Sequence, residues 1–96
     1  MMKKYEGMFI VKPDLSEEDR KTLFNQIGEV ITKHQGNVTS AAVWAERKKF
    51  YFTLKKYGEG LYYLVNFTIL PTAIKDLTHA YQLNENILRL LISNVE

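Results

Sequence analysis

The stretch KFYFTLKKYGEGLYYLVNF, from Lys49 to Phe67, decides the fold. Aromatic and branched side chains dominate both of its halves, which is typical of β-strands. Its centre, from Lys55 to Gly60, holds two lysines and two glycines and is predicted to be a turn. The stretch therefore indicates an antiparallel hairpin, with one strand from Asn37 to about Lys55 and the next from Leu61 to Leu70.

One amphipathic helix is predicted before this hairpin and another after it. In the first, Ser16 is the expected N-cap, acidic residues follow it, and Gly36 is the expected C-terminal stop. The second helix runs from Ala73 to Tyr81. Apolar side chains recur in both helices at three- and four-residue spacing, at Leu23, Phe24, Ile27, Val30, Ile31, Ile74, Leu77 and Tyr81.

The two ends of the chain supply the remaining strands, from Lys4 to Val11 and from Ile87 to Val95. In the first of these, Tyr5, Phe9 and Val11 are expected to share one face. The order is then β-α-β-β-α-β, which places the chain in the α+β class. Right-handed crossovers turn this order into the ferredoxin-like fold, a four-stranded antiparallel sheet with two helices on one face.

Composition narrows the class of protein further. The 96 residues are expected to form a single domain over residues 1–96, and 46% hydrophobic with 25% charged residues is ordinary for a globular chain. Without cysteine there are no disulfides, thiolate metal sites or thiol nucleophiles, which fits a reducing cytoplasm. The first apolar run is interrupted by Glu6 and Gly7, so neither a signal peptide nor a membrane partner is expected.

No catalytic, cofactor or metal site is predicted. His34 and His79 lie in the C-terminal halves of the two helices, where a contact with the helix dipole explains them. The acids from Glu17 to Asp19 form a first helical turn, whereas a hard cation needs oxygen ligands from several elements. Gly58 and Gly60 flank Glu59 and do not make a phosphate-binding loop. Neither an enzyme nor a small-molecule substrate is expected.

Basic residues alternate with tyrosines along the predicted sheet. Many RNA-binding modules present cations and aromatic rings on a sheet to hold phosphates and stack bases. Strand alternation places Arg47 and Lys49 on the face opposite Lys48. An alternative is that lysines protect edge strands from aggregation while tyrosines fill the core. The signature of the common RNA-recognition module is absent, and the net charge is only +2.

The order of several motifs resembles the family of ribosomal protein six of the bacterial small subunit. The similarity covers essentially the whole chain. Its most specific part is the closing LNENILR, from Leu83 to Arg89. The matching segments are Tyr5-Glu6, Lys12–Leu15, His34–Val38, Arg47–Lys56, Glu59–Phe67 and Leu83–Arg89.

This resemblance implies a non-catalytic, ribosome-associated protein that binds the central domain of small-subunit ribosomal RNA together with ribosomal protein eighteen. The RNA contacts would go to phosphate and sugar, which positions RNA without reading bases. The RNA-binding residues expected are Lys3, Lys4, Arg47, Lys48, Lys49, Lys55, Lys56, Asn86 and Arg89. The uncovered sheet face is expected to offer a partner protein the apolar groups Met8, Tyr62, Leu64 and Leu91.

The sequence departs from the family pattern at two places. The family usually has tyrosine-proline-isoleucine at Phe52 to Leu54 and glycine at Glu46, so the bend expected near Ala45 and Glu46 need not follow the family. Many members also continue into a flexible tail that reaches a partner. With so little chain after the last strand, that contact is expected to be less extensive or missing.

Two other functions stay open on the same fold, because fold does not fix function. An acylphosphatase-like enzyme needs a phosphate-binding loop after the first strand, but Val11 to Leu15 contains no glycine and presents Asp14. An oligomerising or ligand-sensing domain would pair its open sheet face with another copy. A phosphatase assay tests the first of these functions, and light scattering tests the second.

Overall fold

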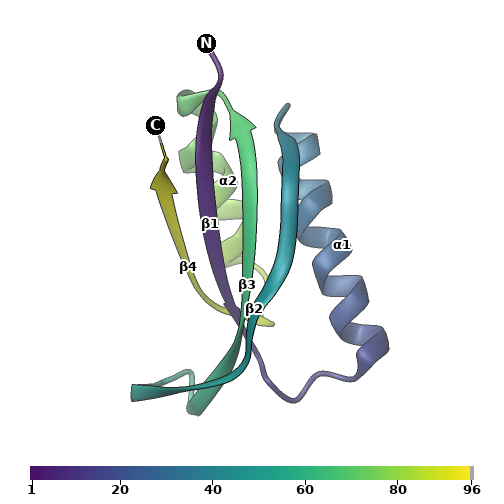
Figure 1. The fold of residues 1–96 in the computed structure, drawn as a ribbon, viewed down its shortest axis with the longest axis vertical. Helices are drawn as coiled ribbons and strands as arrows, with labels where there is room; N and C mark the ends of the chain where they lie inside the picture. Colours follow the sequence, from purple (N-terminus) through teal and green to yellow (C-terminus); the bar gives the residue numbers. More distant parts are fainter. Residues whose placement is uncertain (96) are drawn as a thin grey trace.

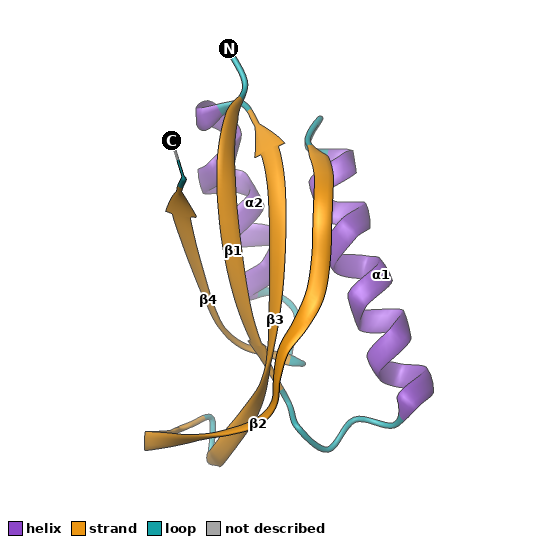
Figure 2. Ribbon diagram, in the orientation of Figure 1, coloured by secondary structure: helices purple, strands orange, loops and turns teal. Residues whose placement is uncertain are grey.

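The computed structural model describes residues 1–95 and has the predicted order of elements. These are β1 (Lys3–Val11), α1 (Glu17–Lys33), β2 (Asn37–Leu54), β3 (Tyr57–Ile69), a short 3-10 turn (Pro71–Ala73), α2 (Ile74–Gln82) and β4 (Ile87–Asn94). The four strands form one antiparallel sheet in the order β2-β3-β1-β4 (Figure 1). Both helices lie against the same face of the sheet (Figure 2), so the ferredoxin-like prediction is confirmed.

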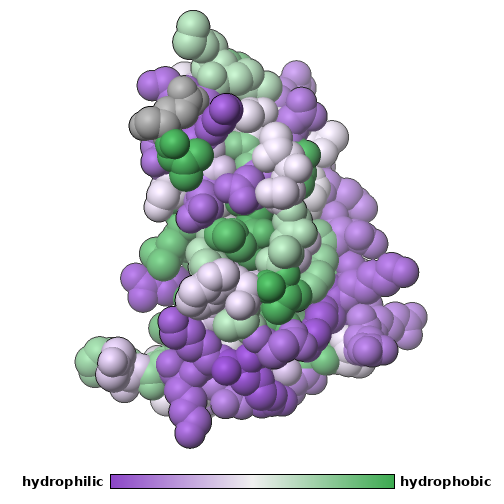
Figure 3. Space-filling view, in the orientation of Figure 1, coloured by the Kyte–Doolittle hydropathy of each residue, from purple (hydrophilic) through white to green (hydrophobic). Residues whose placement is uncertain are grey.

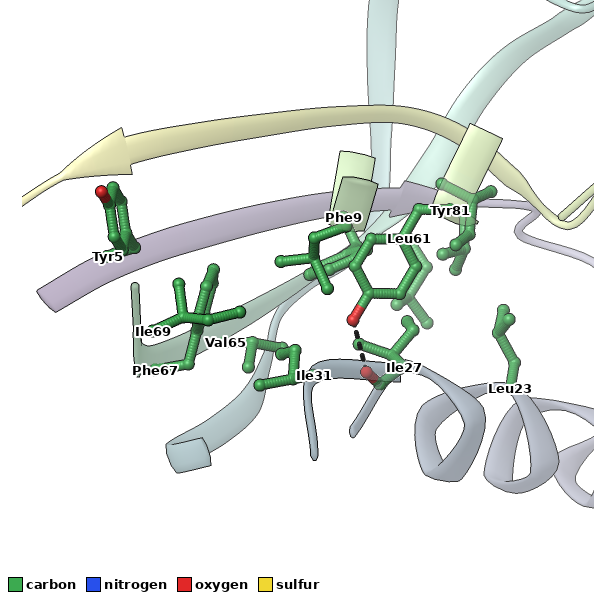
Figure 4. Packing of buried hydrophobic residues seen from close by; sticks show 13 residues of the cluster. Tyr5, Phe9, Leu23, Ile27, Ile31, Leu61, Val65, Phe67, Ile69 and Tyr81 are labelled. Atoms are coloured by element: carbon green, nitrogen blue, oxygen red, sulfur yellow. Dashed lines mark hydrogen bonds between the residues drawn. The ribbon is translucent and has the colours of Figure 1, made fainter. Parts of the chain in front are cut away.

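The core lies between this face and the two helices. Tyr5, Phe9 and Val11 of β1 are buried there, as their alternation predicts. Phe9 meets Tyr81 of α2 edge to face, with ring centroids 4.8 Å apart, and the Tyr81 hydroxyl donates to the Ile27 carbonyl oxygen (Figure 4). The whole cluster comprises Tyr5, Phe9, Val11, Leu23, Ile27, Ile31, Leu61, Val65, Phe67, Ile69, Leu77, Tyr81 and Ile87.

Helix α1 begins and ends much as its sequence indicates. The Ser16 Oγ accepts a hydrogen bond from the Asp19 N–H at 3.1 Å, and the acids of the first turn favour the positive end of the helix dipole. At the C-terminal end of α1, the residue that adopts a left-handed backbone is Gln35, with φ of 69°, and not Gly36. Gly36 is needed for space, because a Cβ there would lie 2.9 Å from the Thr68 carbonyl oxygen.

The β2–β3 hairpin is present, but its predicted turn from Lys55 to Gly60 is too long. Leu54 pairs with Tyr57, so the turn consists of Lys55 and Lys56 alone. Both have positive φ, 49° and 74°, which is the backbone that a two-residue type I′ turn requires. Strand β3 therefore begins at Tyr57 instead of Leu61, and both glycines lie inside it. The other predicted strand and α2 boundaries agree to within one residue.

The expected bend in β2 is also present. The pairing of β2 with β3 shifts register on both sides of Ala45, and again between Lys49 and Leu54. Beside the bend, the Arg20 guanidinium of α1 forms an ion pair with Glu46 at 3.1 Å. Figure 1 shows the closed end of the hairpin turning away from the rest of the sheet. This end therefore projects beyond the helix-covered core.

Candidate nucleic-acid interface

The sheet face opposite the helices carries an apolar row at its centre. Met8 of β1 pairs with Leu64 of β3 on one side and with Leu91 of β4 on the other. Met8 and Leu64 are half-buried, and Leu91 keeps 47% of its surface exposed. Tyr62 lies on the same face, two positions before Leu64 on β3. Figure 3 shows apolar atoms gathering in the middle of this face, above a hydrophilic band.

Most of the predicted RNA-binding residues lie at the end of the sheet where the hairpin turns. The hairpin reaches β4 there, because the Lys55 Nζ donates to the Ile87 carbonyl oxygen at 3.2 Å. Lys3 and Lys4 lie at the opposite end, where Lys3 pairs with Ile69 (Figure 1). The residues gathered at the hairpin end are Arg47, Lys48, Lys49, Lys55, Lys56, Asn86 and Arg89.

Within this group, Arg47 and Lys48 of β2 have different neighbours, whereas Lys49 lines the same hollow as Lys48, so the division between faces that alternation predicts is not complete. The Arg47 guanidinium forms an ion pair with Glu59, so its charge is already compensated. The Lys48 Nζ lies 4.7 Å from the ring centroid of Trp44 and 5.4 Å from that of Tyr62. Because Tyr62 belongs to the open face, Lys48 presents its charge on that face.

Asn86 and Arg89 are only three positions apart but line different surfaces. Asn86 is half-buried and lines a hollow on the helix side together with Glu29 and Glu85. Its carbonyl oxygen accepts a hydrogen bond from the Lys12 N–H at 3.1 Å. Arg89 is exposed on β4, opposite Ile10 on β1. The structure therefore does not bring Asn86 onto the open face with Arg89.

Sequence reasoning missed a hollow of about 280 Å³ at the hairpin end of the open face, which we call the aromatic hollow. Gly60 makes room for it, because a Cβ at Gly60 would lie 2.7 Å from the Phe50 Cζ and 2.9 Å from the Ile10 Cγ2. Phe50 and Phe52 at alternate positions of β2, followed by Gly60 in the next strand, are the sequence signal for it. Its lining is Ile10, Lys48, Lys49, Phe50, Tyr51, Phe52, Leu54, Tyr62 and Arg89.

The histidines and acids that could have formed a metal site do not come together within residues 1–95, where no three His, Asp or Glu side chains gather as metal ligands. The His34 Nδ1 lies 2.8 Å from the Val30 carbonyl oxygen at the end of α1, which is the structural role that its position predicts. No helix within residues 1–95 has the length and apolar character needed to cross a membrane.

Two tyrosines have shifted pKa values, and both are packing residues. Burial raises the pKa of Tyr63, whose ring stacks on Phe24 with centroids 3.8 Å apart. Burial also raises the pKa of Tyr81, which lies in the core. Neither ring lines the aromatic hollow, so these shifts report on the fold rather than on chemistry at the hairpin end.

The structure is a ferredoxin-like sheet with one open face, and cations and aromatic rings gather at its hairpin end. A family model described as ribosomal protein S6 matches residues 4–94. The chain belongs to the ribosomal protein S6 family, and it is a ribosomal protein rather than an enzyme, as its sequence predicts.

Individual relatives agree with this membership. Small ribosomal subunit protein bS6 of Caldanaerobacter subterraneus subsp. tengcongensis is 36% identical over 91 residues, which is 95% of each chain. The bS6 protein of Campylobacter curvus is 39% identical over 94% of this chain and 63% of its own length. The crystal structure of 30S ribosomal protein S6 from Thermotoga maritima superposes with a TM-score of 0.86 at 25% identity, over 98% of this chain and 88% of that one.

Proposed function

We propose that this protein is a component of the small ribosomal subunit that binds the central domain of small-subunit ribosomal RNA together with ribosomal protein eighteen. It acts as one domain of the ribosomal protein S6 type, associated with ribosomes in the cytoplasm. Family membership supports the ribosomal part of this proposal. The observation that carries the rest is the division of the open sheet face into a central apolar row and a cationic hairpin end.

The hairpin end supplies the principal RNA contact. Lys48, Lys49, Lys56 and Arg89 are exposed there, and cations of this kind hold phosphates without reading sequence. Arg47 contributes less because of its ion pair with Glu59. Asn86 contacts RNA from the helix side. Lys3 and Lys4 meet a separate stretch of the RNA at the far end of the sheet.

The central row supplies the contact with ribosomal protein eighteen. An apolar patch on a sheet face is costly to leave in water and is typical of a protein interface. Met8, Tyr62, Leu64 and Leu91 form this patch. Since the net charge of the chain is only +2, counterion release favours RNA binding weakly. A second protein on the apolar row is therefore needed for tight binding.

A mobility-shift titration with a fragment of the rRNA central domain tests this proposal. Binding is expected to be weak for the protein alone and tighter after ribosomal protein eighteen is added. Equal affinity in the two titrations would count against the joint binding site. In cell extracts the protein is expected to co-sediment with small ribosomal subunits, and its absence from that fraction would contradict the ribosomal assignment.

The variant Arg89→Ala is expected to weaken binding of the rRNA fragment by about 1 kcal/mol or more, because it removes a cation from the open face. Its free energy of unfolding should change by less than about 0.5 kcal/mol, since Arg89 is exposed. The matched control is Lys75→Ala, which removes an exposed cation from α2. Equal binding losses in the two variants, or an unfolded Arg89→Ala protein, would show that Arg89 has another role.

A further inference from the structure

We propose that the aromatic hollow binds an unpaired RNA nucleotide, with the base stacked on the aromatic side chains and the phosphate held by Lys48 and Arg89. This inference rests on the proposed rRNA binding and specifies which part of the RNA the hairpin end takes. A phosphate contact alone does not distinguish paired from unpaired RNA, whereas a stacking site accepts only a base whose face is free.

The aromatic side chains at this end comprise three neighbouring rings, Trp44, Tyr62 and Phe50, and two more exposed rings, Tyr51 and Phe52. Trp44 and Tyr62 have ring centroids 5.6 Å apart, and Phe50 and Tyr62 have centroids 6.3 Å apart. Trp44 is 54% exposed, Phe52 is 84% exposed, and Tyr51 is fully exposed. Rings left in water in the isolated protein gain by stacking on a flat partner, and a base on an aromatic side chain is worth about 1–3 kcal/mol.

The charges around these rings favour a nucleotide over a protein. Lys48, Lys49 and Arg89 line the hollow, and no acidic side chain of residues 1–95 is in its lining. The nearby acids Glu46 and Glu59 are engaged by arginines in ion pairs. An apolar or basic protein surface would cover these cations without an opposite charge, which is costly. A nucleotide brings a phosphate for the cations and a flat ring for the aromatic side chains.

The position of the hollow suits an unpaired nucleotide. The hairpin end projects from the sheet (Figure 1), and Gly60 leaves space below the Phe50 ring. In a paired A-form helix the base faces are stacked on one another, and proteins reach mainly phosphates and 2′-hydroxyls. A loop or bulge of the RNA instead offers a splayed base that can enter the hollow.

Trp44 is the only tryptophan of the chain, and its ring lies beside Tyr62, which lines the hollow, so its fluorescence reports on a base bound next to Tyr62. The experiment titrates the full chain at low salt with a single-stranded oligoadenylate and, separately, with a paired RNA duplex of equal length. A base near the indole ring is expected to quench its emission. We expect saturable quenching by the oligoadenylate and little by the duplex. Equal quenching by both would overturn the proposal.

The variant Phe52→Ala is expected to weaken oligoadenylate binding roughly tenfold, because it removes part of one stacking interaction. The matched control is Leu83→Ala, which removes another exposed apolar side chain, 73% exposed, from the turn before β4. Tyr51→Ala is a second test at the hollow if Phe52→Ala does not fold. Equal oligoadenylate affinity in the hollow variants and the Leu83→Ala control would overturn the proposal.

A titration with ribosomal protein eighteen and the rRNA fragment separates this inference from the proposed function. Because Trp44 lies beside Tyr62, ribosomal protein eighteen alone is expected to change Trp44 emission. Loss of oligoadenylate binding at saturating ribosomal protein eighteen would make the hollow a protein contact and overturn the nucleotide site. Joint binding of the rRNA fragment with no further change in Trp44 emission would also overturn it, while leaving the proposed function intact. Quenching by oligoadenylate without any joint rRNA binding would support the hollow and contradict the proposed function.

Discussion

Gly58 and Gly60 lie two positions apart on β3 and differ in what surrounds them. A Cβ at Gly58 meets nothing within 4 Å, whereas one at Gly60 meets Phe50 at 2.7 Å. Gly60→Ala is therefore expected to lower the free energy of unfolding by about 1–3 kcal/mol through overpacking. Gly58→Ala should be neutral or stabilising by up to about 1 kcal/mol, because it restricts the unfolded chain. Urea unfolding of both variants checks this, and similar effects would contradict it.

Tyr81 couples the stability of the core to alkaline pH. Burial raises its pKa, so the folded chain holds the hydroxyl proton more tightly than the unfolded chain does. This contribution is complete below about pH 10, the ordinary tyrosine pKa, and is lost as the pH rises further. Tyr81→Phe should cost about 0.5–1.5 kcal/mol at neutral pH, because the hydrogen bond to the Ile27 carbonyl oxygen disappears.

Above about pH 10 the stability gap between the natural chain and Tyr81→Phe should narrow, because only the natural chain loses the contribution of this proton. Urea unfolding at neutral and alkaline pH measures both gaps. The matched control is Tyr51→Phe, which removes the same hydroxyl from a fully exposed ring. Phe9→Tyr is not suitable, since it adds a hydroxyl to the core. A gap for Tyr81→Phe that is the same at both pH values would show that Tyr81 is not the titrating group.

At the scale of single residues, the sequence predicts which side chains are buried better than it predicts which residues contact one another in the folded chain. The buried positions of β1 and α1 follow from alternation and helical spacing, which are local properties. The ion pair between Arg20 and Glu46 joins residues far apart in the sequence, so no local pattern contains it. Asn86 and Arg89 are three positions apart in the sequence, but the start of β4 places them on different surfaces. Their closeness in the sequence therefore does not predict a shared site.

At the scale of the elements, the two-residue turn is built from residues that do not suit it. Lys55 and Lys56 both have positive φ, a conformation that costs a residue with a Cβ about 1 kcal/mol or more. Lys56→Gly is expected to raise the free energy of unfolding by about 1 kcal/mol. The control Lys56→Ala removes the same charge but keeps the Cβ, so it should bring no such gain. Thermal unfolding compares the two, and an equal gain would assign the effect to charge.

The same turn shows where prediction from sequence fails at this scale. Glycine is the usual source of positive φ, so two glycines in Lys55 to Gly60 predict a wide turn there. In the structure these glycines have ordinary strand conformation, and the lysines adopt the left-handed backbone. The cross-strand pairing of Leu54 with Tyr57 fixes the tighter turn. Periodicity identified the strands, but it could not decide which residues make their connection.

At the scale of the whole molecule, β2 leaves one edge of the sheet open. It is the outermost strand, and its half from Asn37 to Ala45 carries no charged side chain. Uncharged edges pair readily with another copy, whereas a lysine discourages this. The isolated protein is therefore expected to self-associate as its concentration rises, and Ala42→Lys should reduce this. Light scattering measures it, with Gln82→Lys on α2 as a charge-matched control. Equal suppression by both would indicate general repulsion rather than edge pairing.

The sequence predicts the overall arrangement because the β-α-β-β-α-β order permits few topologies. The open face and its apolar row follow from that topology and from alternation along β1, β3 and β4. The gathering of cations at one end does not follow from the order alone. It depends on the bend in β2 and on the reach of Lys55 to the Ile87 carbonyl oxygen, which are properties of the folded chain.

The central place of β1 has a consequence for how the protein is made. Of the strands in this sheet, β1 leaves the peptide exit tunnel first, and it pairs on one side with β3 and on the other with β4, the last of these strands to be made. Until translation reaches β4, a nascent chain can assemble β1, β2 and β3, but the far side of β1 keeps its backbone amides unpaired. Closure of so long a loop is intrinsically slow. The growing chain thus cannot complete the pairing of β1 until β4 has been made.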